Sequence, residues 1–91
     1  MTNTELLTHI KSGLMITGNA FDDALLLHAN EVKEYLVNAG VPSTVVDSDK
    51  SIGIITRGVA DLWTNDSPSL SSYFHERVSQ MVISYGGDHD V

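Results

Sequence analysis

The stretch between residues 19 and 40 is the longest helical pattern in the chain, and the other segments are expected to pack against it. Its apolar residues recur at spacings of three and four, which places them on one face of a helix; they are Phe21, Leu25, His28 or Ala29, Val32, Leu36 and Ala39. Leu26, Leu27 and Tyr35 fall outside that line, so we expect this helix to be covered on two or three sides. The extra width indicates either the centre of a bundle or a subunit interface.

Both ends of this pattern carry residues that are typical of helix termini. Asn19 is a candidate N-cap, and Asp22 with Asp23 suits the positive end of the helix dipole. Gly40, followed by Pro42, predicts the end of the helix. The expected helix therefore begins near Asn19 and ends at Gly40.

Size and composition limit the chain to one domain. Its 91 residues, 42% of them hydrophobic, form a single modest core, and we expect one helical domain over residues 1–91 with a flexible acidic tail at 86–91. The chain has no cysteine, which excludes disulfides and thiolate metal sites. It shows neither a signal peptide nor a run of about 20 apolar residues. We therefore expect a soluble protein that is made in the cytoplasm and has no membrane contact.

The net charge is strongly negative. Twelve acidic residues against five basic ones give a formal charge of −7, which argues against a surface that grips nucleic-acid phosphates. The basic residues are scattered singly in the sequence: Lys11, Lys33, Lys50, Arg57 and Arg77. The charge is typical of a wall that repels DNA, or of a small protein that it merely keeps in solution.

Three further segments have helical patterns. Thr2 and Glu5 match a capping box that opens a short first helix. A third helix is expected from Ser51 to Trp63, and a fourth from about Ser69 to Tyr85, after a Ser67-Pro68 cap. The apolar residues of these helices are Leu6, Leu7, Ile10 and Leu14 in the first, Ile52, Ile55, Val59, Leu62 and Trp63 in the third, and Leu70, Phe74, Val78, Met81, Val82 and Tyr85 in the fourth.

The predicted fold class is all-α: a small bundle of about four helices around a long central helix, with no sheet. We interpret Ser43 to Val46 as part of a loop, whose Val45 and Val46 are either tucked under the bundle or offered to a neighbour. Gly53 and Gly58 lie inside the third helix, where glycine is unfavourable, and indicate a close approach of another backbone. Trp63 is expected to belong to the core rather than to an interface.

No motif in the chain predicts catalysis or metal binding. Residues 47–51 begin like an EF-hand loop, but Ile52 stands where the loop needs glycine and Gly58 where it needs a bidentate glutamate. A cap for the third helix, by Ser48 or Asp49, explains these residues better. The four histidines show no ligand spacing, and no nucleophile elbow or phosphate-binding glycine loop is present. We expect no enzyme activity, no catalytic residues, no metal and no cofactor.

Three loose motifs follow one another in a distinctive order. The chain opens with Leu7, Ile10, Lys11, Leu14 and Ile16; an acidic pair, Asp22 and Asp23, then starts the long helix; Leu62, Trp63 and Asn65 mark a later turn. This order resembles that of the small head-tail connector proteins of tailed bacteriophages, also called adaptor or head-completion proteins. The similarity covers most of residues 4–85. The chain departs from the family at residues 63–66, where Trp-Thr-Asn-Asp replaces a Tyr-Glu-Asn-Arg-like run, and in its short C-terminal tail.

The resemblance implies a structural virion protein at the head-tail interface, made in the host bacterial cytoplasm. Such subunits assemble into a ring, commonly of twelve copies, below the portal protein, where they extend the DNA channel without specific DNA binding and offer a surface to a stopper or tail-completion protein. The alternative is a small acidic regulatory or inhibitory protein that binds a basic partner through Asp22, Asp23, Glu31 and Glu34. Candidate contacts with other copies or partners are Leu26, Tyr35, Val45, Val46 and Tyr73.

Overall fold

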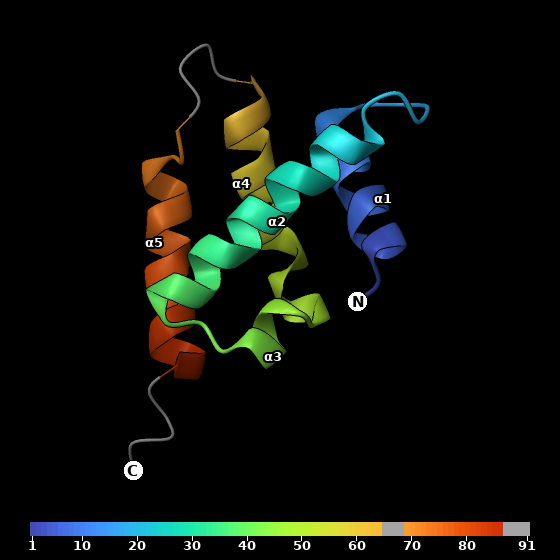
Figure 1. Cartoon of the computed structure of the whole chain (residues 1–91). Helices are drawn as coiled ribbons and strands as arrows, with labels where there is room; N and C mark the ends of the chain where they lie inside the picture. Colours follow the sequence, from blue (N-terminus) through green and yellow to red (C-terminus); the bar gives the residue numbers. More distant parts are fainter. Residues whose placement is uncertain (65–68, 87–91) are drawn as a thin grey trace.

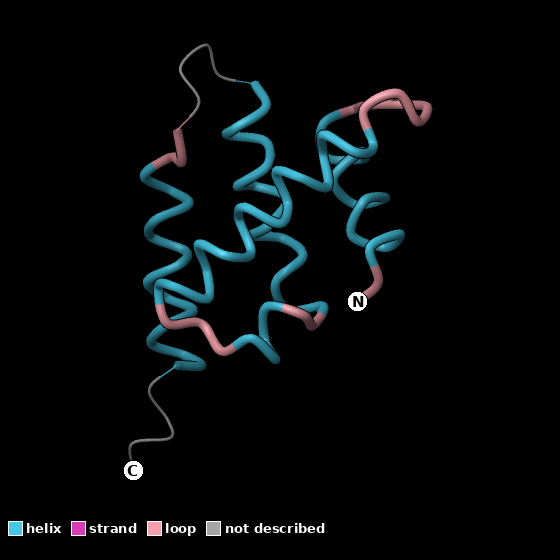
Figure 2. The backbone as a smooth tube through the Cα atoms, in the orientation of Figure 1, coloured by secondary structure: helices cyan, strands magenta, loops and turns pink. Residues whose placement is uncertain are grey.

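The computed structural model describes residues 1–64 and 69–86 and shows an all-α fold, with no strand among these residues (Figures 1 and 2). Its elements are α1 (Asn3–Leu14), α2 (Asp22–Ala39), α3 (Ser43–Val46), the 3₁₀ turn η1 (Asp49–Ser51), α4 (Ile52–Thr64), α5 (Ser72–Met81) and the π turn η2 (Val82–Gly86). The predicted fold class is confirmed.

Helices α2 and α4 form the centre of the bundle. In Figure 1, α2 runs diagonally across α4, with α1 at one end and α5 at the other. Helix α4 packs against α1, α2 and α5, and α2 also contacts α1 and α3. One core joins all five helices, and its buried members are Leu6, Ile10, Leu25, Ala29, Val32, Leu36, Val41, Val46, Ile54, Ile55, Val59, Phe74, Val78 and Met81.

Helix α1 begins with the predicted capping box. The Glu5 amide donates to Thr2 Oγ1 at 3.1 Å, and the Thr2 amide donates to Glu5 Oε1 at 2.8 Å. Hydrogen bonds that the carboxylate accepts, first from the Thr2 backbone amide and then from the Thr2 side chain, lower the pKa of the Glu5 carboxyl below its ordinary value of 4.5 because they favour the charged form. Thr2 and Glu5 therefore fix the start of α1, and the first buried residue, Leu6, follows directly after them.

The start of α2 differs from the expectation. The helix begins at Asp22 with Phe21 in the cap position, and no side chain caps it. Asn19 is not the cap, because its Oδ1 lies 3.3 Å from Lys11 Nζ, which also forms an ion pair with Asp22 Oδ1 at 2.8 Å. Lys11 thus ties α1 to the first turn of α2.

The end of α2 is as predicted. Gly40 has φ 113°, a left-handed conformation that favours glycine, and its amide bonds back to the last turn. The next amide, that of Val41, donates to the Leu36 carbonyl at 3.0 Å, which completes a Schellman-type ending and directs Val41 into the core.

The prediction of a loop at residues 43–46 is wrong, because this segment forms α3. The Pro42 carbonyl accepts hydrogen bonds from the amides of Val45 and Val46 at 2.9 and 3.0 Å, so a single turn follows directly after the proline. Ser48 then caps η1 by accepting from the Lys50 amide, and the buried Ser51 hydroxyl donates to the Val46 carbonyl. Burial of Val46 compensates for the poor intrinsic stability of so short a helix.

The two glycines of α4 have different environments. A Cβ on Gly58 would lie 2.7 Å from Phe74 Cε1 and 2.8 Å from Val32 Cγ1, so α2 and α5 both approach α4 here, through side chains rather than backbone. The close approach that was expected at Gly53 is absent, because a Cβ there would meet nothing within 4 Å. Gly13 has a comparable role on α1, because its Cβ would lie 2.9 Å from Thr56 Cγ2 of α4.

Helix α5 begins later than predicted. Its cap is Ser71, whose Oγ accepts from the Phe74 amide at 3.1 Å, and the helix starts at Ser72 rather than near Ser69. The expected cap Ser67-Pro68 and Asn65 of the turn motif lie outside the described residues. At the other end the chain continues as η2 through Gly86, so Gly86 is not part of a tail; positions 87–91 of the expected tail lie outside the described residues.

Candidate functional site

The five predicted contact residues come from three helices and do not form one surface. Val46 is only 2% exposed and belongs to the core, so it is corrected from a contact to a packing residue. Val45 and Leu26 are partly buried, and Val45 packs against the core. Tyr35 and Tyr73 are exposed, on α2 and α5 respectively. Among the described residues, six of the seven large apolar side chains that are exposed lie on four surfaces, and the seventh is Val37 on α2.

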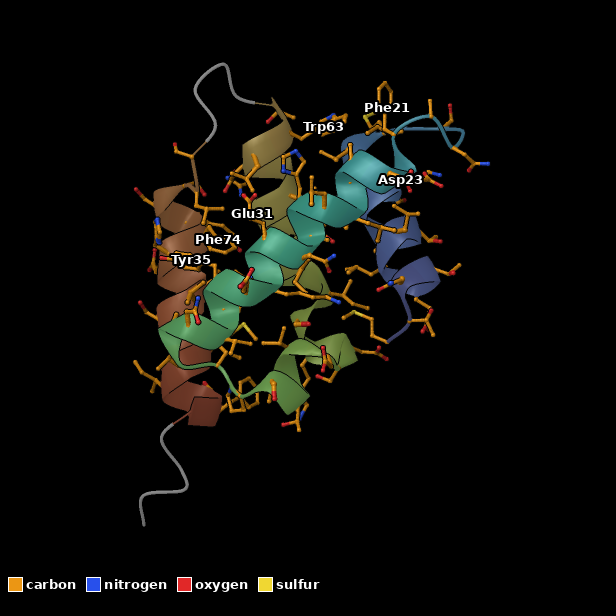
Figure 3. The ribbon with its side chains drawn as sticks, viewed as in Figure 1. Phe21, Asp23, Glu31, Tyr35, Trp63 and Phe74 are labelled. Carbon is orange, nitrogen blue, oxygen red and sulfur yellow. The ribbon has the colours of Figure 1, made fainter. Side chains whose placement is uncertain are left out.

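A groove opens between the C-terminal half of α2 and the α5–η2 segment. Its volume is about 380 Å³, and it is lined by Tyr35, Ala39, His75, Val78, Ser79, Val82 and Ile83. Tyr35 Oη lies 2.9 Å from His75 Nδ1, and the Tyr35 ring packs on Phe74 at a centroid distance of 5.7 Å (Figure 3). Ile83 is 81% exposed at this groove, which we call the C-terminal groove. The sequence pattern did not identify Ile83, because it lies outside the apolar face of its helix.

The opposite end of α2 carries an aromatic edge. The Trp63 ring meets the Phe21 ring edge-on at 5.4 Å and the His28 ring at 5.9 Å (Figure 3). Trp63 is half-buried and packs against the core, so it closes this end of the bundle while part of the ring stays accessible. Met15 is 91% exposed in the loop that precedes Phe21. We call Met15, Phe21 and Trp63 the N-terminal edge.

The side of α2 that faces away from the core is acidic. Leu27 follows the buried Leu25 by two positions, about 200° around the helix, and is 67% exposed. Asp23 and Glu31 lie four residues before and after Leu27, and Glu34 lies seven after it, so the three carboxylates share one side of α2 with this leucine and form a row along the helix. We call these four residues the outer face of α2. Asp22, which was expected to belong to it, is instead bound to Lys11.

Two arginines that are far apart in sequence meet at one tyrosine. The guanidinium carbons of Arg57 on α4 and Arg77 on α5 lie 5.2 and 5.9 Å from the centre of the Tyr73 ring, and Arg77 Nη1 donates to Tyr73 Oη at 3.1 Å. We call these residues the arginine–tyrosine cluster. It brings together two basic residues that are scattered in the sequence. The spacing of Tyr73 and Arg77 at i, i+4 is visible in the sequence, whereas the approach of Arg57 depends on how α4 and α5 pack.

Asp61 holds this cluster in place. Its Oδ1 lies 3.3 Å from Arg57 Nε, and its Oδ2 accepts from the Ser71 amide at 3.0 Å. The carboxylate is nearly buried, and it therefore links the α4 side of the cluster to the first turn of α5. The sequence analysis missed Asp61, because an acidic residue on an exposed turn and one that is buried look the same in a helical pattern.

No group of three or more His, Asp or Glu side chains within residues 1–64 and 69–86 is arranged to hold a metal ion. A second depression of about 540 Å³ lies between α1 and the following loop, where the Lys11–Asp22 ion pair occupies its polar side. None of the helices in the described part of the chain is both long enough and apolar enough to cross a bilayer.

No protein-family model, curated protein or solved structure matches the chain, so its surfaces have to be interpreted from their own geometry and charge.

Proposed function

We propose that the chain is a subunit of a bacteriophage head-tail connector, a ring beneath the portal that extends the DNA channel and receives a stopper or tail protein. The order and spacing of its opening motif, acidic pair and Leu62-Trp63 helix end support this proposal. So does the all-α bundle, which is the architecture that the resemblance implies.

The observation that carries the proposal is the distribution of exposed apolar side chains over four separate surfaces. Besides Val37 on α2, these side chains are Met15 and Phe21 at the N-terminal edge, Leu27 on the outer face of α2, Tyr35 and Ile83 at the C-terminal groove, and Tyr73 in the arginine–tyrosine cluster. A symmetric dimer covers one patch on each copy, whereas a ring subunit needs two different surfaces for its two neighbours. Two further surfaces are then needed for the portal above and the stopper or tail protein below.

The two ends of α2 suit the contacts along the ring axis. The N-terminal edge and the C-terminal groove lie at opposite ends of this helix, as the labelled Phe21 and Tyr35 show in Figure 3. In our proposal one end meets the portal and the other meets the stopper or tail protein. The formal charge of −7 supports a channel wall that does not retain the DNA passing through it.

The test is assembly of the phage that encodes the chain, with its composition measured by mass spectrometry. We expect the chain in purified virions together with portal and tail proteins, at about the copy number of one ring. Ile83→Asp places a charge at the C-terminal groove, and we expect DNA-filled heads without tails. Ser84→Asp is the matched control, since Ser84 is also exposed in η2. Absence of the chain from virions would overturn the proposal.

The outer face of α2 favours a second candidate function, that of an acidic regulatory or inhibitory protein. Asp23, Glu31 and Glu34 are all exposed in a row with Leu27 along one side of α2, an arrangement that suits a partner with basic groups and an apolar contact. Affinity capture from an infected lysate separates the two functions. Recovery of a polymerase or nuclease that is lost with Glu31→Lys would favour the regulator, whereas recovery of portal and tail proteins would favour the connector.

A further inference from the structure

The arginine–tyrosine cluster brings two of the five basic residues of a strongly acidic chain together on one surface, where Arg57 and Arg77 converge on Tyr73. Of the other three, Lys11 is paired with Asp22, Lys33 is partly buried on α2, and Lys50 lies 5.3 Å from the Tyr85 ring centre. Arg57 shares its charge with Asp61, but Arg77 makes no ion pair within residues 1–64 and 69–86. The Tyr73 ring is 50% exposed beside these two guanidinium groups. The cluster therefore presents an aromatic surface next to positive charge.

This cluster lies on the side of the domain opposite to the outer face of α2. On α4, the side that faces α2 carries Gly58, which lies against Val32, and Trp63, which meets Phe21 and His28. Arg57 lies about 100° from Gly58 and about 120° from Trp63 around the helix axis, on the side that faces away from α2. On α5, Phe74 and His75 face α2, because both rings contact Tyr35. Tyr73 lies about 100° from Phe74 and about 200° from His75 around the helix axis, so it faces away from α2. Both helices thus turn the cluster away from α2.

We propose that the arginine–tyrosine cluster of one copy binds the outer face of α2 of the next copy, with Leu27 against the Tyr73 ring and the three carboxylates around Arg57 and Arg77. This inference rests on the proposed ring and names its subunit contact. Charge complementarity selects the occupant: two copies with a net charge of −7 each repel one another unless their few basic groups meet acidic ones.

The position of the two surfaces determines the kind of assembly. Because they differ and lie on opposite sides, each copy can use both at once, and the contact is head-to-tail rather than symmetric. Such contacts continue from copy to copy and close into a ring when the rotation between neighbouring copies divides a full turn. The Leu27–Tyr73 contact supplies the apolar part of the interface, and the charges around it set its direction and register.

The test uses cross-linking between engineered cysteines, because the natural chain has none. The two substitutions are Asn30→Cys and Gln80→Cys. Asn30 is exposed on α2, three residues from Leu27, and Gln80 is exposed on α5, three residues from Arg77, so each cysteine lies beside one of the two proposed surfaces. Chains with one cysteine each are mixed at high concentration and treated with a short bismaleimide. We expect cross-linked dimers between Cys-substituted positions 30 and 80 at about ten times the yield of a control pair, Asn30→Cys with Met15→Cys. High salt should remove this excess.

Charge exchange distinguishes this contact from chance collision. Arg77→Glu in the Gln80→Cys chain, or Glu31→Arg in the Asn30→Cys chain, is expected to reduce the yield about tenfold, and combining the two variants is expected to restore it. Circular dichroism confirms that each variant is folded. The inference would be overturned by a cross-linking yield between positions 30 and 80 that equals that of the control pair, or by a yield that does not recover when the two charge variants are combined. Presence of the chain in virions would then still support the connector function through a different contact.

Discussion

The Ser71 amide donates a hydrogen bond to Oδ2 of Asp61 at 3.0 Å, so a nearly buried carboxylate on α4 fixes the point at which α5 begins. The other oxygen of Asp61 holds Arg57, one member of the arginine–tyrosine cluster. A single side chain therefore couples the packing of two helices to the surface that we propose as a subunit contact.

Asp61→Ala is expected to lower the free energy of unfolding by about 1–3 kcal/mol, because it removes the acceptor of a partly buried amide. The Arg57 ion pair adds little, since the Arg57 side chain is 48% exposed. Asp61→Asn keeps an acceptor and should lose less. Urea unfolding followed by circular dichroism measures both variants, and equal losses would show that the charge rather than the hydrogen bond matters.

Gly58→Ala should destabilise the protein even though alanine favours a helix. The added methyl would lie 2.7 Å from Phe74 Cε1 and 2.8 Å from Val32 Cγ1, and overpacking of this kind costs about 1–3 kcal/mol. Gly53→Ala in the same helix is the control, because nothing lies within 4 Å of its Cβ and a gain of up to about 1 kcal/mol is expected. Denaturant midpoints compare the two, and a stabilised Gly58→Ala chain would refute this packing.

Trp63→Ala is expected to cost about 2–3 kcal/mol, less than the full loss of a buried aromatic, because Trp63 is half-buried. The edge contacts with Phe21 and His28 should be lost with it. Trp63→Phe retains a ring and should lose less. Thermal unfolding reports stability and mass measurement reports assembly; an unchanged melting temperature with failed assembly would assign Trp63 to an interface instead.

Glu5→Gln should lower stability at neutral pH and have little effect in acid. The pKa of Glu5 is lowered in the folded chain by hydrogen bonds from Thr2, so its contribution is present above the ordinary value of 4.5 and is lost as the pH falls through the folded pKa. Glu31→Gln is the control on an exposed side chain of α2. Melting temperatures at pH 7 and at low pH test this, and a difference that persists in strong acid would contradict the capping role.

Helix termini show how far the sequence alone predicts the fold. The Thr2–Glu5 capping box and the Gly40 ending are present as expected, since each depends on residues within four positions of one another. The starts of α2 and α5 were misplaced by about three residues, because Asn19 is drawn to Lys11 and Ser71 takes over the cap of α5. Those choices depend on neighbouring helices rather than on local preference.

The candidate surfaces were less predictable than the helices. Tyr35 and Tyr73 were expected as contacts and are exposed, whereas Val46 is in the core because α3 turns it inward. Ile83, Asp61 and the approach of Arg57 to Tyr73 were not foreseen. Each depends on which side of a helix meets a neighbour, and hydrophobic periodicity indicates the buried face without naming its partner.

The sequence by itself determined that the chain is helical, where the helices roughly lie and that the protein is strongly acidic, because helix periodicity, capping and charge are local or additive properties. The tertiary structure decided that Gly58 and not Gly53 is a contact point, and that Arg57 and Arg77, 20 positions apart in the sequence, converge on Tyr73. The physical reason is that these relationships arise from the way α4 packs against α2 and α5, which places side chains together only after the core has formed.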